Sequence, residues 1–201
     1  MRAVLRFVAS VLMVSGVLLI GDAAATLIWQ EPVSALVAER QQSKLEDALA
    51  DPPPRVVKRK PLPGDAIGRL DIAAIGVKEY VVEGTDTENL RKGPGHYPHT
   101  PLPGERGTSA IAGHRTTYGA PFRDINKLRR RNVITMALPY GRYVYRVERT
   151  KIVDDADFSV LRKVRHDRLV LTACHPLYSA AQRVVVFARL VRREPSRVRR
   201  S

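Results

Sequence analysis

The chain of 201 residues contains one cysteine, Cys174, which ends an apolar run and directly precedes a polar loop. The run Leu-Val-Leu-Thr-Ala at 169–173 predicts a buried strand, and reactive groups are often presented where such a strand meets a loop. A thiolate is a strong nucleophile, but an ordinary thiol is mostly protonated at neutral pH and needs a base or a positive partner. Cys174 is therefore a candidate nucleophile, and the alternative is a buried structural cysteine.

Among the five histidines of the chain, His114 is the best candidate for that base. It follows the short apolar run 109–112 and Gly113, and a histidine at a strand exit after a small residue can approach another segment closely. His175 is adjacent to Cys174, so on a strand its side chain points to the opposite face. The alternative for His114 is a turn or capping role.

The other three histidines predict neither a base nor a metal site. His166 lies among arginines and a lysine, in a predicted solvated turn. His96 and His99 flank a Tyr-Pro pair and could form half of a metal site, but no third ligand follows at a recognisable spacing. We therefore expect no metal ion and no cofactor.

Arg183 opens the next apolar run, and only residues 175–182 separate it from Cys174. If the two flanking strands pair as a hairpin, Cys174 and Arg183 face each other at the same rim. A fixed guanidinium there could hold a carbonyl oxygen as negative charge develops on it. The alternative is one more surface arginine in a chain that has 34 basic residues.

The elements that position these groups are short. Apolar runs separated by Gly and Pro turns predict strands at 66–72, 77–82, 109–112, 133–137, 141–154, 168–173 and 183–191, with short helices at 89–92, 121–128 and 158–162. Many short strands without long alternating helices favour an antiparallel barrel or sandwich. Before them, residues 31–63 predict a helix at 32–50 and a stiff linker that begins at three consecutive prolines and holds the domain off the membrane. We expect the β domain at 64–191 and a basic tail at 192–201.

The N-terminal segment 1–30 predicts a membrane anchor. Residues 7–21 carry no charge, and Arg2 and Arg6 precede them. Positive residues before an apolar run keep the N-terminus cytoplasmic, which predicts a single-pass protein whose remaining chain is extracytoplasmic. The alternative is a cleaved signal peptide with its site near residues 23–25. Either way the chain leaves the cytoplasm, where an unpaired cysteine suggests a reactive thiol.

The net charge of +14 is the most conspicuous feature of the composition. A single cysteine excludes an intramolecular disulfide framework and a cysteine-rich zinc site. The basic tail lacks interleaved aromatic residues, and no nucleic-acid motif accompanies it, so we expect no nucleic-acid partner. We expect the positive charge of the chain to attract it to an anionic surface, such as a membrane or a cell wall.

Three segments together resemble the sortase family. Residues 111–122 (Ile-Ala-Gly-His-Arg-Thr-Thr-Tyr-Gly-Ala-Pro-Phe) are similar to the catalytic-histidine region, 169–176 to the catalytic-cysteine strand, and Gln182-Arg183 to the arginine strand. The Gly/Pro-rich loop at 93–104 is similar to sortase sequence upstream of the histidine. The Cys-His-Pro continuation and the N-terminal anchor resemble class E, with class D as the near alternative.

The resemblance implies a mostly β fold: a closed eight-stranded barrel with short helices, preceded by a transmembrane helix. It implies a cysteine transpeptidase that cleaves a C-terminal sorting signal of a secreted protein between Thr and Gly, with Cys174 as nucleophile, His114 as acid and base, and Arg183 as oxyanion stabiliser. The acyl group would pass to an amine of a peptidoglycan precursor or a pilin. Class E members are associated with Leu-Ala-x-Thr-Gly in place of Leu-Pro-x-Thr-Gly.

Substrate contacts are expected from residues near the triad. Tyr97 either lines the pocket for the second residue of the signal or packs in the core, and Thr172 and Ala173 directly precede the nucleophile. The family pattern there is Thr-Leu-x-Thr-Cys, but Val170 and Ala173 replace both pattern threonines. Two rival functions stay open. An L,D-transpeptidase would carry Ser-His-Gly-Cys-x-Arg, which is absent, and a basic wall-binding module would leave the three residues incidental.

Overall fold

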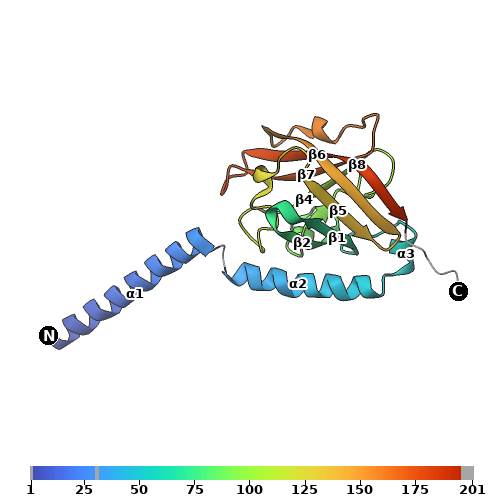
Figure 1. The fold of residues 1–201 in the computed structure, drawn as a ribbon. Coiled ribbons are helices and arrows are strands. Elements are labelled where there is room, and N and C mark those ends of the chain that lie inside the picture. Colours follow the sequence, from blue (N-terminus) through green and yellow to red (C-terminus); the bar gives the residue numbers. More distant parts are fainter. Residues whose placement is uncertain (1, 30–31, 196–201) are drawn as a thin grey trace.

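The computed structural model describes residues 2–29 and 32–195. In this part of the chain, eight strands form a closed barrel in the order β1-β2-β3-β4-β7-β8-β6-β5 (Figure 1), which confirms the predicted architecture. The strands are β1 (Ala66–Ile72), β2 (Val77–Glu83), β3 (Gly95–His96), β4 (Thr108–Ala112), β5 (Val133–Leu138), β6 (Gly141–Asp154), β7 (Arg168–His175) and β8 (Gln182–Pro195). The helices are α1 (Arg2–Trp29), α2 (Pro32–Ala50), α3 (Pro54–Val57), α4 (Thr87–Leu90), η1 (Ala73–Ile75), η2 (Ile125–Lys127) and η3 (Phe158–Leu161).

Two strands differ from the sequence prediction. The two-residue β3 was not predicted, because a Gly/Pro-rich loop carries no apolar run. β8 continues to Pro195, so the first residues of the predicted basic tail pair with β6, with Pro195 opposite Gly141. Main-chain hydrogen bonds to β6 extend β8 into this polar segment, although it lacks a run of apolar side chains. The rest of the predicted tail lies outside the described residues.

The barrel interior is filled by alternate residues of the strands. On β7, Leu169, Leu171 and Ala173 point into the main core, whereas Val170 packs outside the barrel in a second, smaller cluster with Phe187. An eight-stranded barrel is just wide enough for side chains to fill, so this interior is a packed core and holds no channel. Every second residue of β7 therefore faces outward, Cys174 among them.

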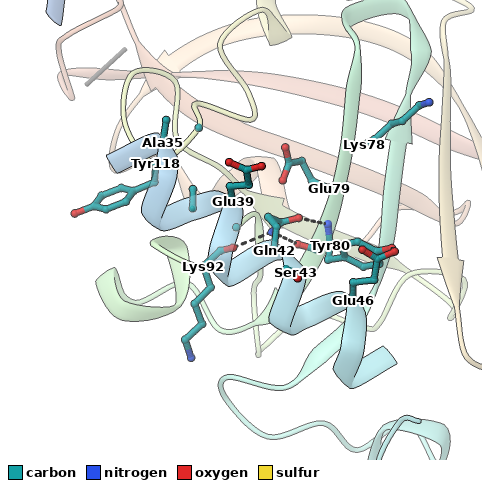
Figure 2. A pocket seen from close by; sticks show the side chains of 13 residues that line it. Ala35, Glu39, Gln42, Ser43, Glu46, Lys78, Glu79, Tyr80, Lys92 and Tyr118 are labelled. Carbon is teal, nitrogen blue, oxygen red and sulfur yellow. Dashed lines mark hydrogen bonds between the residues drawn. The ribbon is translucent and has the colours of Figure 1, made fainter. Parts of the chain in front are cut away.

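Helix α2 packs against the barrel wall along β1 and β2 (Figure 1). Leu45 is buried with Ala66 and Val82. The side-chain amide of Gln42 accepts a hydrogen bond from the Tyr80 N–H at 2.6 Å and donates to the Tyr80 carbonyl at 3.0 Å (Figure 2). Because β3 pairs only with the last two residues of β2, Gln42 satisfies the open edge of β2 as a neighbouring strand would.

The structure therefore adds α2 to the folded unit, which the sequence placed at 64–191. The Pro-rich segment after α2 also differs from the expected extended linker, because Pro54–Val57 form one helical turn with Pro54 at its start. A proline is well accommodated in the first turn, where its missing N–H has no helical partner. Arg55 of this turn pairs with Asp65 at 2.7 Å, so the segment folds back onto the barrel.

Glu79 gives the α2 side of the barrel a pH-dependent stability. It lines the groove between α2 and β2 (Figure 2), where burial raises the pKa of its carboxyl from 4.5 to about 7. The folded state then binds a proton that the unfolded state releases above pH 4.5, so stability falls as pH rises from 4.5 through 7.

We expect Glu79→Gln to raise the free energy of unfolding at pH 8, by at most about 3 kcal/mol, and to leave it unchanged near pH 4. Urea unfolding followed by circular dichroism at the two pH values measures the difference. Exposed Glu88→Gln is the control, and an equal gain at both pH values would contradict the assignment.

Helix α1 is long and apolar enough to cross a membrane. Its candidate span, Arg2–Ala24, covers 23 residues with a mean hydropathy of 2.4, and its most apolar stretch is exposed throughout. Figure 1 shows α1 apart from the barrel, whereas α2 runs along it. A helix with no protein covering its apolar surface suits a lipid environment.

Candidate active site

Cys174 and Arg183 lie directly opposite each other at one rim of the barrel. β7 and β8 pair as the predicted antiparallel hairpin, and their register sets Cys174 across from Arg183. The Cys174 side chain is partly exposed and forms no disulfide. The Arg183 guanidinium donates through Nη1 to the carbonyls of Ala180 at 2.7 Å and of Gln182 at 2.9 Å, which fixes it at the start of β8.

His114 comes to the same rim through the parallel pairing of β4 with β7. Ala112 is the register partner of Thr172, and the Gly113 N–H donates to the Thr172 carbonyl at 3.0 Å. β4 ends at Ala112, and His114 follows two residues later, beside the end of β7 that carries Cys174. The pairing thus brings His114 to the rim of Cys174 and Arg183, from which it is far apart in the sequence.

The surroundings of His114 keep its imidazole neutral. Burial, together with the positive charge of Arg91, lowers the pKa of His114 below its usual value of 6.5. Its ring lies against that of Tyr118, with 5.3 Å between the centroids. Within the described residues, its buried Nε2 has no hydrogen-bond partner. This nitrogen is therefore not committed to a structural hydrogen bond.

Gly113 explains why a small residue must precede His114. The ring of fully buried Phe122 lies so close that a Cβ on Gly113 would come within 2.5 Å of it. The Phe122 N–H also donates to the His114 carbonyl at 2.9 Å. Any larger residue at 113 would push the histidine segment off β7.

Arg115 is a residue that sequence reasoning missed. Only 5% of it is exposed, and its guanidinium donates to the Cys174 carbonyl at 3.1 Å, to the Arg123 carbonyl at 3.1 and 3.2 Å, and to Asn126 Oδ1 at 2.9 Å. It also lies 3.4 Å from Nδ1 of His175. Arg115 therefore ties the histidine loop to the backbone of Cys174. Its position next to His114 could have suggested a role at the site, but a single arginine does not stand out among 34 basic residues.

A small groove lies beside Arg183 on the outer side of β6, β7 and β8. Its lining includes Tyr97, Thr172, Val153 and Val185, with η3 as one wall. Tyr97 Oη lies 3.2 Å from Thr172 Oγ1, and the Tyr97 ring also packs on the smaller apolar cluster. Its contact with the second residue of a signal peptide stays a prediction. Thr172 lies on the same outward face of β7 as Cys174.

The wall formed by η3 is held by a buried arginine. Arg168 donates through Nη2 to the carbonyls of Val160 at 2.7 Å and of Arg162 at 2.9 Å, and through Nε to Thr108 Oγ1 at 3.1 Å. Arg168 thus connects the first residue of β7 to the loop that borders the groove.

The structure does not bring Ala173 into this groove. Its side chain is 4% exposed and belongs to the main core, because it is one residue out of step with Thr172 on β7. Val170, the other departure from the threonine pattern, is fully buried among Ala110, Val153, Val185 and Phe187. Both replacements therefore meet apolar surroundings, which suit Val and Ala better than a hydroxyl.

The remaining histidines keep the roles of structural or surface groups. His96 is 1% exposed, and its Nδ1 lies 2.8 Å from Glu83 Oε2, with its Nε2 3.1 Å from the Pro101 carbonyl. His166 lies 3.4 Å from Glu148. Among residues 2–29 and 32–195, no group of three or more His, Cys, Asp or Glu side chains could hold a metal ion.

The hydrogen bonds of Arg115 predict a large stability effect. Arg115→Met leaves two carbonyls and an amide oxygen without their donors, and we expect it to lower the free energy of unfolding by about 2–4 kcal/mol. Chemical denaturation measures the loss. Arg129→Met, which removes an exposed arginine that bonds only to neighbouring carbonyls, should cost less than about 1 kcal/mol. Equal losses would show that Arg115 does not tie the loop to β7.

Comparison with known proteins gives one consistent result. Residues 70–191 match the family model of the sortase domain. Sortase D of Bacillus subtilis is 36% identical over 137 residues, covering 66% of this chain and 67% of that protein. Sortase SrtE1 of Streptomyces coelicolor is 27% identical over 209 residues, covering 94% of this chain, which spans 58% of the length of SrtE1.

The solved structures agree with the sequence relatives. The SrtF sortase of Corynebacterium diphtheriae superimposes with a TM-score of 0.65 at 28% identity, covering 70% of this chain and 92% of the other. Sortase E1 of S. coelicolor, solved with a tripeptide in its active site, gives 0.62 at 27% identity, with coverages of 67% and 93%. The shared barrel, the match over 70–191 and the likeness to class E lead to one conclusion: this chain belongs to the sortase family of cysteine transpeptidases.

Proposed function

We propose that the chain is a membrane-anchored sortase that cleaves a Leu-Ala-x-Thr-Gly or Leu-Pro-x-Thr-Gly type signal between Thr and Gly and transfers the acyl group to an amine. The observation that carries the proposal is the meeting of Cys174, His114 and Arg183 at one rim through the β7–β8 and β4–β7 registers. The small groove beside Arg183, lined by Tyr97 and Thr172, would border one side chain of the signal peptide.

In the acylation step, the Cys174 thiolate attacks the threonine carbonyl carbon. Arg183, held across the hairpin, stabilises the negative charge that develops on the carbonyl oxygen. The C–N bond to glycine then breaks as protonated His114 gives its proton to the leaving nitrogen. The products are a thioester on Cys174 and the free amino end of the released fragment.

The second step transfers the acyl group. A neutral amine of a peptidoglycan precursor or a pilin attacks the thioester carbon, and neutral His114 takes the proton that the attacking nitrogen loses. The Cys174 thiolate leaves, so an amide bond replaces the thioester and the enzyme is regenerated.

Substrate selection is proposed to reside in the groove. Tyr97, bonded to Thr172 at 3.2 Å, would border the second residue of the signal, and the tripeptide held in the active site of S. coelicolor sortase E1 supports a peptide at the corresponding rim. Helix α1, with its charge-free stretch behind Arg2 and Arg6, would anchor the enzyme with the barrel outside the cytoplasm. Secreted proteins that carry the signal would then reach the rim near the membrane.

A peptide assay tests the proposed function. The full chain in detergent is incubated with a Leu-Ala-x-Thr-Gly peptide and triglycine, and mass spectrometry is used to look for the Thr–amide product. We expect this product only when both peptide and amine are present. Failure to form it from either the Ala or the Pro form of the signal overturns the proposal, and product from a D-amino-acid tetrapeptide would indicate an L,D-transpeptidase instead.

A further inference from the structure

A groove on the barrel wall, remote from Cys174, has a strongly basic lining. It lies over β6 and β8 and the turn before β5, and all five of its arginines are exposed. We call it the arginine groove; its charged lining residues are Arg130, Arg131, Arg146, Arg149, Arg189, His166 and Glu148. It is open to solvent and has a volume of about 500 Å³.

The charge of this groove is not balanced from within. Its only carboxylate, Glu148, accepts from Arg189 at 2.7 Å and lies 3.4 Å from His166. In the part of the chain that the structure describes, none of the other four arginines of the groove forms an ion pair with a carboxylate. The groove therefore holds several guanidinium groups whose charge only solvent or a ligand can neutralise.

The strand register concentrates this charge. Arg146 of β6 is the direct partner of Arg189 of β8. Like charges opposite each other on neighbouring strands are destabilising, and a bound anion between them would remove that repulsion. Arg149, two strand positions further in the same groove, stacks over Phe187 at 4.7 Å, which orients its guanidinium.

The groove is separate from the active-site rim. Arg189 lies six residues along β8 from Arg183, which is roughly 20 Å at 3.3 Å per residue. The strands that carry the groove, β6 and β8, lie away from α2, which packs on β1 and β2 (Figure 1). A ligand here can be bound while the rim is occupied, and it approaches from the side away from the N-terminal helices.

We propose that the arginine groove binds a linear polyanion with repeating phosphate groups, of the phosphodiester-polymer type. Guanidinium forks match phosphate oxygens in pairs, and arginines from two strands and a turn give one chain several contacts. A concave groove on the face away from α1 and α2 fits a threaded polymer better than it fits a flat lipid surface. Such binding would hold the enzyme close to an anionic wall polymer without involving the triad.

The test uses the full chain in neutral detergent and fluorescently labelled inorganic polyphosphate, with binding followed by anisotropy at about 50 mM salt. We expect Arg130→Gln/Arg146→Gln to weaken binding roughly tenfold or more, and to reduce the salt dependence of log K by about 2. The matched control is Arg142→Gln/Lys151→Gln, which removes the same charge from exposed positions of β6 outside the groove. This control should bind nearly as well as the wild type.

Other results would overturn the proposal. Equal weakening by both double variants would show diffuse charge attraction, and no binding by the wild type would exclude the site. If the groove residues instead govern binding to phosphatidylglycerol vesicles while polyphosphate is not bound, the ligand is a lipid surface. Thermal unfolding verifies that each variant folds. Peptide cleavage should be unchanged in both variants, so this test and that of the proposed function fail independently.

Discussion

Replacing Cys174 by alanine is expected to abolish the formation of Thr–amide product, with a fall in rate of about 10⁴-fold or more. The sulfur is the atom that forms and breaks the acyl bond, and it is the only thiol in the chain. With wild-type protein, mass spectrometry under acidic quench should detect an adduct of the enzyme with the peptide up to its threonine. The adduct should be absent from Cys174→Ala.

The control for this experiment is the fold of the variant. Cys174 is partly exposed at the end of β7, so the loss of one sulfur should leave the unfolding temperature almost unchanged. A methanethiosulfonate reagent should label the wild type without denaturant and should not label Cys174→Ala. Product formation that persists in Cys174→Ala, or a thiol that reacts only after unfolding, would show that the cysteine is structural.

Most of the barrel could be predicted from hydrophobic patterning. The runs at 66–72, 141–154 and 168–173 alternate or are continuously apolar, and each became a strand of the sheet. β3 could not be found this way, because Gly95 and His96 are fixed by partners on β2 and β4 rather than by their own propensity. Of the short predicted helices, the one at 121–128 is limited to the single turn η2, whose Ile125 packs in the core.

The packing of α2 against the barrel could not be predicted from the sequence either. Its composition predicts the helix and its bounds, but the contact that joins it to the barrel is a side-chain amide bonded to the main chain of Tyr80. Such a contact depends on an open strand edge, which exists only because β3 is short. No local sequence pattern around Gln42 predicts this contact.

The active-site rim was predictable to a different degree for each residue. Cys174 and Arg183 follow from hairpin geometry, because a short loop between two apolar runs fixes their register. The place of His114 depends on the parallel pairing of β4 with β7, two strands separated by about half of the barrel sequence. The role of Arg115 was the hardest to predict, because its hydrogen bonds to Cys174 and Asn126 join segments that are brought together only in the folded chain.

Side chains of β7 point alternately outward and into the core, which separates the residues next to Cys174 into two groups. Thr172 lines the groove and Cys174 lies on the same outward face of β7, whereas Ala173 faces the core. The two departures from the threonine pattern therefore alter packing beside Cys174 and leave Tyr97 and Thr172 in place on the outer face. Substrate preference should consequently follow Tyr97, Thr172 and the η3 wall rather than residue 173.

His114→Ala is expected to lower kcat/KM for the amide substrate by about 10²- to 10⁴-fold, because the leaving amine must receive a proton as the C–N bond breaks. Burial keeps the pKa of His114 below 6.5, so only a minor fraction of the enzyme carries that proton at pH 7. A substrate with a Thr–glycolate ester in place of the Thr–Gly amide has a leaving group that depends less on protonation. Its cleavage should therefore fall much less.

Two readouts separate this chemical role from a structural one. Added imidazole should partly restore amide cleavage by His114→Ala, because the small base can enter the space beside Tyr118 that the ring vacates. The matched control is His175→Ala, which removes an imidazole adjacent to the nucleophile in sequence but carried on the other face of β7. It should retain most of the activity and show no rescue. If the amide and ester rates fall equally in His114→Ala and imidazole restores neither, the histidine positions the rim and transfers no proton.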